Sequence, residues 1–154
     1  MSAKEDIEPS DPFDLTRFVV AQERSYRDAL SEVRAGRKDS HWMWYIFPQI
    51  AGLGGSSMAR RYAIKSAGEA RAYLDHSLLG PRLVECAEAI LRVQGRSARE
   101  ILGFPDDLKL RSCATLFGSV RPGSPVFQRI LDRYYQGAPD ERTLGILADM
   151  SRRQ

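Results

Sequence analysis

The sequence contains only two cysteines and two histidines among its 154 residues. Cys86 and Cys113 stand far apart without a C-x-x-C spacing, and His41 and His76 provide no paired ligands either. So sparse a set argues against a zinc site. We therefore predict no metal and no cofactor, and we interpret both cysteines as small buried hydrophobic residues.

Long apolar runs are also missing. No stretch approaches the roughly 18 apolar residues of a membrane-spanning helix, and residues 1–12 are acidic and lack a hydrophobic segment. The sequence therefore predicts a cytoplasmic protein that is neither secreted nor inserted into a membrane. Lys and Arg exceed Asp and Glu by only 23 to 20 and form no concentrated stripe. A nucleic-acid partner is therefore not expected, and the oligomeric state stays open.

Apolar residues recur at spacings of three and four along most of the chain, with turn signals between the periodic segments. This pattern predicts an all-α fold, an irregular single-domain array of about seven to eight helices over residues 14–150, preceded by a flexible tail over residues 1–13. Asp14 is expected to cap the first helix and Gly36 to end it. Capping-box patterns start at Ser66 and Ser97, and His76 is expected in a turn or cap.

The segment from His41 to Gln49, H-W-M-W-Y-I-F-P-Q, concentrates aromatic residues. One interpretation is a core plug, because aromatic side chains bury large areas. The other is a ligand site, because flat rings with polar edges can hold a nucleobase. In that interpretation Trp42, Trp44, Tyr45 and Gln49 bind the ligand.

Polar residues elsewhere could complete such a site. Arg37 and Lys38 precede the block and could hold a phosphate, although such a cluster is commonly just solvated. Gln22 interrupts the apolar face of the first helix, so its amide must find hydrogen bonds, either in the core or to a ligand. The glycine-rich loop over residues 52–57 could serve as a hinge or offer backbone N–H groups to an anion.

Carboxylates could supply chemistry to this site. Asp106 and Asp107 open a predicted helix and Glu69 belongs to a capping-box pattern, so each has a structural explanation. If they face the aromatic block, they become candidate catalytic groups together with His41, and Lys109 becomes a candidate ligand-binding residue.

The same segments carry a resemblance to a known family. They resemble the bacterial domain-of-unknown-function family 1810 over roughly residues 14–148, most specifically in the string G-R-K-D-S-H-W-M-W-Y-I-F-P-Q at residues 36–49 and in D-D-L-K-L-R-S at residues 106–112. One departure is Cys113-Ala114, where the family more often carries Ser-Met. The resemblance implies a multi-helical single domain without an established activity. A more distant similarity runs to the NADAR family of ADP-ribose-linked N-glycosidases, which are also largely helical.

Two hypotheses follow. The first is a pocket for a phosphate-bearing, nucleotide-like or ADP-ribose-like small molecule, with an N-glycosidase as its catalytic form. The second is a non-catalytic module for a protein or nucleic-acid partner, in which the aromatic block is structural core. The sequence leaves open whether the protein is an enzyme.

Overall fold

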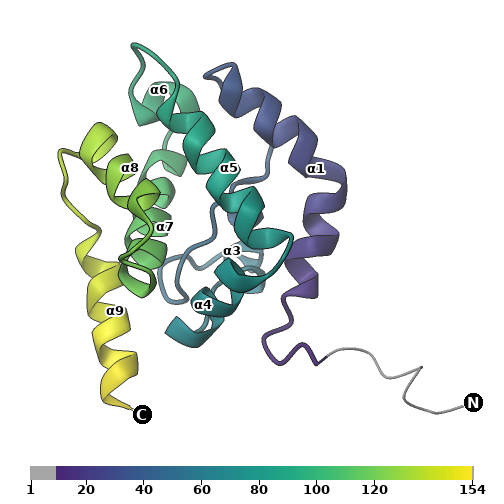
Figure 1. Ribbon diagram of the computed structural model, residues 1–154, viewed down its shortest axis with the longest axis vertical. Coiled ribbons are helices and arrows are strands. Elements are labelled where there is room, and N and C mark those ends of the chain that lie inside the picture. The colour runs from purple at the N-terminus through teal and green to yellow at the C-terminus, as the bar shows by residue number, and fades with distance from the viewer. Residues whose placement is uncertain (1–9, 154) are drawn as a thin grey trace, which may run out of the picture.

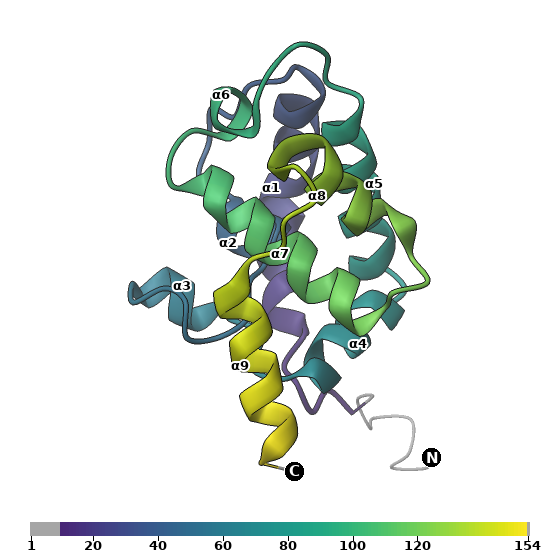
Figure 2. The ribbon, with the colours of Figure 1, turned by 90° about the vertical axis from the view of Figure 1, so that its left-hand side faces the viewer.

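Nine α-helices make up the part of the chain, residues 10–153, that the computed structural model describes (Figures 1 and 2). The prediction of an all-α fold is confirmed, but the predicted number of about seven to eight helices is too low. Three helices have only four or five residues, too short for a 3.6-residue periodicity to reveal. The helices are α1 (Thr16–Arg34), α2 (Met43–Ile46), α3 (Ser57–Arg61), α4 (Ala67–Asp75), α5 (Leu79–Leu91), α6 (Ala98–Leu102), α7 (Asp106–Val120), α8 (Pro125–Tyr135) and α9 (Glu141–Arg152).

The first helix is capped by Asp11, so the prediction of an Asp14 cap is wrong. The Asp11 carboxylate accepts hydrogen bonds from the backbone N–H groups of Leu15 at 2.8 Å and Thr16 at 3.0 Å. These bonds satisfy N–H groups that have no partner inside the helix. The Thr16 backbone bond also lowers the pKa of Asp11. Of the predicted tail, residues 1–9 lie outside the described part of the chain, whereas Phe13 packs against the core.

A row of aromatic rings runs through the core and joins four helices. Phe18 of α1 meets Tyr73 of α4 with ring centroids 5.1 Å apart, and Tyr73 meets Phe117 of α7 at 5.4 Å. Phe117 in turn meets Phe127 of α8 at 5.8 Å. Around this row α5 packs against α1, α4 and α8, with α1 and α5 side by side in Figure 1. Aromatic pairs at such distances add to the stabilisation from buried area.

Both cysteines lie in this core, as predicted. Cys86 of α5 and Cys113 of α7 are free thiols, and both are buried. Burial raises the pKa of the Cys86 thiol to about 12 and that of Cys113 well above its usual value. Neither thiol therefore has the character of an activated nucleophile.

One segment stands apart from the bundle. A pair of backbone hydrogen bonds joins Ile64 to the chain before it: Ala51 N–H donates to the Ile64 carbonyl and Ile64 N–H to the Gln49 carbonyl, each at 2.8 Å. Residues 51–61, which we call the flap, leave the bundle at this bridge and carry α3. Figure 2 shows α3 projecting beside α2, α7 and α9. No residue of α3 is buried. The flap forms one wall of the cleft that is described below.

Candidate functional site

The aromatic block is mostly core. Trp42, Met43, Ile46 and Phe47 are each at most 2% exposed, and Tyr45 is buried as well. Their polar edges have protein partners: the Trp42 indole donates to Glu32 at 2.9 Å, and the Tyr45 hydroxyl lies 2.9 Å from the Ser25 hydroxyl. The core-plug interpretation therefore describes the packing of these five residues.

Trp44 is the exception in the block. It is half-buried, and its ring lines a cleft between the flap and the start of α7. The Lys109 ammonium lies 5.2 Å from the ring centroid, which is within the range of a cation–π contact. Gln49 lines the same cleft. Within residues 10–153, neither the Trp44 indole N–H nor the Gln49 amide has a protein hydrogen-bond partner.

The cleft has two compartments that meet at a shared waist. The waist consists of Trp44, Gln49, Gly54, Ala59 and Lys109. The first compartment, of about 270 Å³, has an apolar floor and a polar rim; its further lining residues are Met43, Phe47, Ile50, Ala51, Gly52, Arg60, Tyr62, Ala63 and Lys65. The second, of about 450 Å³, is lined in addition by Leu53, Gly55, Ser56, Pro105, Leu108, Arg111, Ser112, Asp140 and Arg142.

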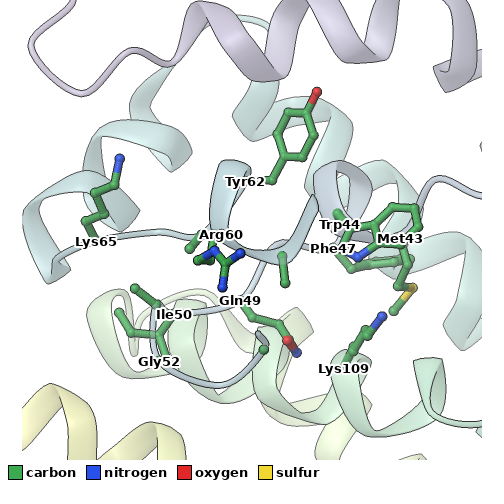
Figure 3. Close-up of a pocket in the computed structure, with 14 residues that line it drawn as sticks. Met43, Trp44, Phe47, Gln49, Ile50, Gly52, Arg60, Tyr62, Lys65 and Lys109 are labelled. Atoms are coloured by element: carbon green, nitrogen blue, oxygen red, sulfur yellow. The ribbon is translucent and has the colours of Figure 1, made fainter. Parts of the chain in front are cut away.

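The side chains of the first compartment come from two stretches of the chain. In Figure 3, Trp44, Met43 and Phe47 gather on one side and Lys65 stands on the other, with Arg60 and Gln49 drawn between them. The flap supplies Arg60, and the residues after α2 supply the floor. Their placement follows from the bridge at Ile64, which returns the chain to the base of the cleft.

The cleft carries an excess of positive charge. Arg60, Lys65 and Lys109 line the first compartment without any carboxylate, and Lys109, Arg111 and Arg142 line the second with Asp140. The Asp140 carboxylate is already engaged, since its Oδ2 accepts from the Thr143 N–H and hydroxyl and from the Ser112 hydroxyl. The arrangement therefore favours an anionic ligand.

Lys38 and Asp106 lie beside the cleft rather than in its lining. Lys38 Nζ is 3.0 Å from Asp106 Oδ2, and Lys109 Nζ is 3.2 Å from Asp106 Oδ1. Lys38 also lies 5.2 Å from the centroid of the Trp42 ring. Each oxygen of the Asp106 carboxylate thus faces an ammonium group, which ties the loop before α2 to the start of α7.

Gln22 and Glu69 satisfy their polar groups inside the protein. The Gln22 amide donates to the Tyr45 carbonyl at 2.8 Å and to the Tyr73 hydroxyl at 3.2 Å. The Glu69 carboxylate forms a buried ion pair with Arg17 at 2.7 Å, and its other oxygen accepts from the Lys65 N–H. Ser66 caps α4 as predicted. Neither Gln22 nor Glu69 lines the cleft.

The remaining predicted site residues also lie away from the cleft lining. Arg37 is exposed and 3.4 Å from Asp39, and His41 is exposed. Asp107 sits in the first turn of α7 with one buried carboxylate oxygen that has no partner among the described residues. Of the twelve predicted site residues, the cleft thus brings together Trp44, Gln49 and Lys109.

Sequence reasoning missed the basic rim. Arg60, Lys65, Arg111 and Arg142 belong to the flap, the bridge region, α7 and α9, and no spacing in the sequence links them. The glycine-rich loop over residues 52–57, with its predicted role as a hinge or an anion-binding loop, is the sequence feature that points to this part of the cleft. His76 was predicted correctly as a cap: its Nδ1 accepts from the backbone N–H groups of Leu78 and Leu79.

Residues 10–153 lack two features that would define a protein class. This part of the chain contains no group of three or more His, Cys, Asp or Glu side chains placed to hold a metal ion. Likewise, none of its helices combines the length and apolar character needed to cross a bilayer.

The fold and cleft define a single-chain all-helical protein with a basic, aromatic-lined pocket. Residues 12–147 match the model of the family described as "Protein of unknown function (DUF1810)", and the chain belongs to this family. This confirms the resemblance to family 1810, whereas the similarity to the NADAR family finds no support in this match.

A solved structure shares the fold. The conserved hypothetical protein Rv1873 from Mycobacterium tuberculosis is 55% identical, with a TM-score of 0.89 over 90% of this chain and 99% of its own. Among curated proteins, none matches this chain.

Proposed function

We propose that this protein binds a small phosphate-bearing molecule with a flat ring, of the nucleotide type, in the cleft beside the flap. The observation that carries the proposal is the waist, where the half-buried Trp44 ring and the Lys109 ammonium lie 5.2 Å apart. An aromatic surface next to a cation suits a ligand that is both flat and anionic.

The groups around the waist match the needs of such a ligand. Packing of a base against an aromatic side chain contributes about 1–3 kcal/mol. The Trp44 N–H and the Gln49 amide, which have no hydrogen-bond partner within residues 10–153, can bond to the polar edge of a ring. Arg60 and Lys65 on the rim can hold a phosphate. The remaining lining of the first compartment is mostly apolar, as small-molecule sites commonly are.

The proposal is restricted to binding. An N-glycosidase needs a carboxylate or an equivalent base placed at the bond to be cleaved. Asp140 is the carboxylate among the lining residues of the cleft, and three hydrogen bonds from Thr143 and Ser112 to its Oδ2 hold it as the cap of α9. Asp106 faces two lysines, and Glu69 is buried against Arg17.

A partner-binding module is the second candidate. It is favoured by Phe104 and Leu108, which are 62% and 48% exposed although both are large and apolar. Leu108 also lines the second compartment. In this alternative the cleft edge receives a side chain from a protein, so Phe104→Ser, at a position outside the cleft lining, would weaken partner binding without changing the affinity for a nucleotide.

The test follows Trp44 fluorescence. The chain has two tryptophans, so Trp42→Phe leaves Trp44 as the single reporter, and Trp44→Phe leaves Trp42 as the matched control. We expect adenosine 5′-monophosphate (AMP) to change the Trp44 signal saturably and to leave the Trp42 signal unchanged. Lys109→Gln should weaken AMP binding about fivefold, because it removes a charge-assisted contact.

Two further measurements test AMP binding and the charge around Trp44 independently. The melting temperature of the wild-type protein should rise with AMP, since a ligand that binds only the folded state stabilises it. Relative to free tryptophan, iodide should quench Trp44 more strongly and caesium less strongly, because the surrounding cations attract the anionic quencher and repel the cationic one. The proposal is wrong if millimolar AMP and ADP-ribose change neither the fluorescence nor the melting temperature.

A further inference from the structure

The second compartment lies beyond the waist and is larger than the first. Resting on the proposed function, we infer that the ligand spans both compartments and carries two separated anionic groups, one on each side of its flat part. The class is thus a nucleotide phosphorylated at two positions, or an organic bisphosphate of similar length. One anionic group faces Arg60 and Lys65, and the other faces Arg111 and Arg142.

The volumes support a ligand of this length. Pockets for small organic ligands measure about 300–1,000 Å³. The first compartment alone, at about 270 Å³, lies just below that range, and the second has about 450 Å³. Because five residues line both compartments, the two spaces adjoin at Trp44, Gln49 and Lys109. A ligand confined to the first compartment would leave the larger space to water.

Cations line both compartments. Arg60 and Lys65 line the first compartment alone, and among the described residues neither forms an ion pair. Arg111 and Arg142 line the second compartment alone. Arg111 donates its Nε–H to the Ala138 carbonyl at 2.9 Å, which fixes the guanidinium at the edge of α7. Each compartment thus offers two cationic side chains of its own.

The positive charge at the waist is partly compensated. Lys109 lies there, but its ammonium is 3.2 Å from the Asp106 carboxylate. That carboxylate also pairs with Lys38 at 3.0 Å, so two lysines share one negative charge. The first compartment has Arg60 and Lys65 without a carboxylate, and in the second Arg111 and Arg142 exceed the single carboxylate of Asp140. Both compartments are therefore net positive, which fits a ligand with one anionic group in each.

Arg142 has a second role in the second compartment. Its guanidinium lies 3.5 Å from the Gly52 carbonyl of the flap, a long hydrogen bond from α9. Ile146 of α9 lies against the same glycine, because a Cβ there would be 3.4 Å from its Cδ1. Arg142 therefore both contributes charge and contacts the wall that separates the compartments from solvent.

The experiment compares three probes by isothermal titration calorimetry: AMP, ADP and adenosine 3′,5′-bisphosphate. ADP and the bisphosphate both carry two phosphates, adjacent in ADP and separated in the bisphosphate, so the pair varies the separation at a fixed number of phosphates. We expect the bisphosphate to bind about tenfold more tightly than ADP, a difference of about 1.4 kcal/mol.

Variants of the arginines in the two compartments give the second readout. Arg142→Gln and Arg111→Gln should weaken bisphosphate binding about fivefold or more and change AMP binding less than twofold. Arg60→Gln should weaken both probes. Arg142→Lys, which keeps the charge, should restore most of the bisphosphate affinity, which a purely structural role for Arg142 in the flap contact would not predict.

The outcomes separate this inference from the proposed function. If AMP binds but ADP binds as tightly as the bisphosphate, the two-ended ligand is refuted and the proposed cleft stands. The same holds if Arg142→Gln weakens AMP as much as the bisphosphate. If none of the three probes binds, both proposals fail. Binding of the bisphosphate alone supports the inference, since the second anionic group then provides the decisive contact.

Discussion

The Trp42 indole N–H donates a hydrogen bond to Glu32 Oε1 over 2.9 Å. The same carboxylate accepts from the backbone N–H groups of Asp39 at 2.7 Å and Ser40 at 2.8 Å, and from the Ser40 hydroxyl at 2.6 Å. Glu32 thereby ties the end of α1 to the loop that leads into α2. This contact joins α1 to the start of the aromatic block, directly before α2.

The Glu32 contact predicts a pH-dependent stability. Burial raises the pKa of Glu32, but the bonds from Ser40, Trp42 and Asp39 outweigh it and lower the pKa from 4.5 to about 2. Because the folded-state pKa is depressed, the stabilisation is complete above the unfolded value and is lost as the pH falls from about 5 to 2. With solvent screening, we expect Glu32→Gln to remove about 1 kcal/mol at pH 7.

Urea unfolding at pH 7, 4 and 2.5 measures this effect. The difference between wild type and Glu32→Gln should shrink as the pH falls. Glu23→Gln, an exposed position on the same helix, is the matched control and should show no such trend. A constant difference between wild type and Glu32→Gln at all three pH values would contradict the prediction.

Two glutamines give a contrast between core and cleft. Gln22 bonds to Tyr45 and Tyr73, and its oxygen accepts from Arg82 at 3.3 Å. Gln22→Ala should therefore lower the unfolding free energy by about 2–4 kcal/mol, because buried polar partners and a cavity remain. The Gln49 side-chain amide has no hydrogen bond within residues 10–153, so Gln49→Ala should change the unfolding free energy by less than about 0.5 kcal/mol. Chemical denaturation of both variants tests this; equal losses would show that Gln49 is also structural.

The sequence could predict Gln22 as a special residue because it interrupts a periodic apolar face. Periodicity and capping rules likewise predicted the long helices and the Ser97–Glu100 capping box. They could not predict the cleft, because its walls come from α2, the flap, α7 and α9. Nor does any local pattern show that Trp42 is buried and bonded to Glu32 whereas the neighbouring Trp44 lines the cleft.

Substitution of Arg17 should destabilise the protein more than substitution of Glu69, its partner in a buried ion pair. Its side chains are 5% and 2% exposed, and a buried carboxylate needs its cation. Arg17 in addition donates to four backbone carbonyls, those of Phe13, Asp14, Arg61 and Ala63, at 2.7–2.8 Å. We expect about 3–5 kcal/mol of destabilisation for Arg17→Met and less for Glu69→Gln.

The double variant Arg17→Met, Glu69→Leu separates the pair from these backbone contacts. Removing both charges should recover part of the loss, but the four carbonyls remain without their donor. Its unfolding free energy is therefore expected to lie between that of Arg17→Met and that of the wild type. Full recovery would mean that the carbonyl bonds contribute nothing.

Substitution by alanine should change the stability in opposite directions at two helical glycines. A Cβ at Gly80 in α5 would lie 2.1 Å from the Leu74 carbonyl oxygen, whereas a Cβ at Gly145 in α9 would meet nothing within 4 Å. Because Leu74 O is backbone at the end of α4, Gly80→Ala must push the two helices apart and should cost about 3 kcal/mol or more. Gly145→Ala should gain up to about 1 kcal/mol from helix propensity. In thermal melts these changes correspond to a fall of roughly 6–12 °C and a rise of roughly 2–4 °C. A Gly80→Ala protein that melts with the wild type would mean that α4 and α5 can separate at no cost, and the close contact at Leu74 would then play no part in joining them.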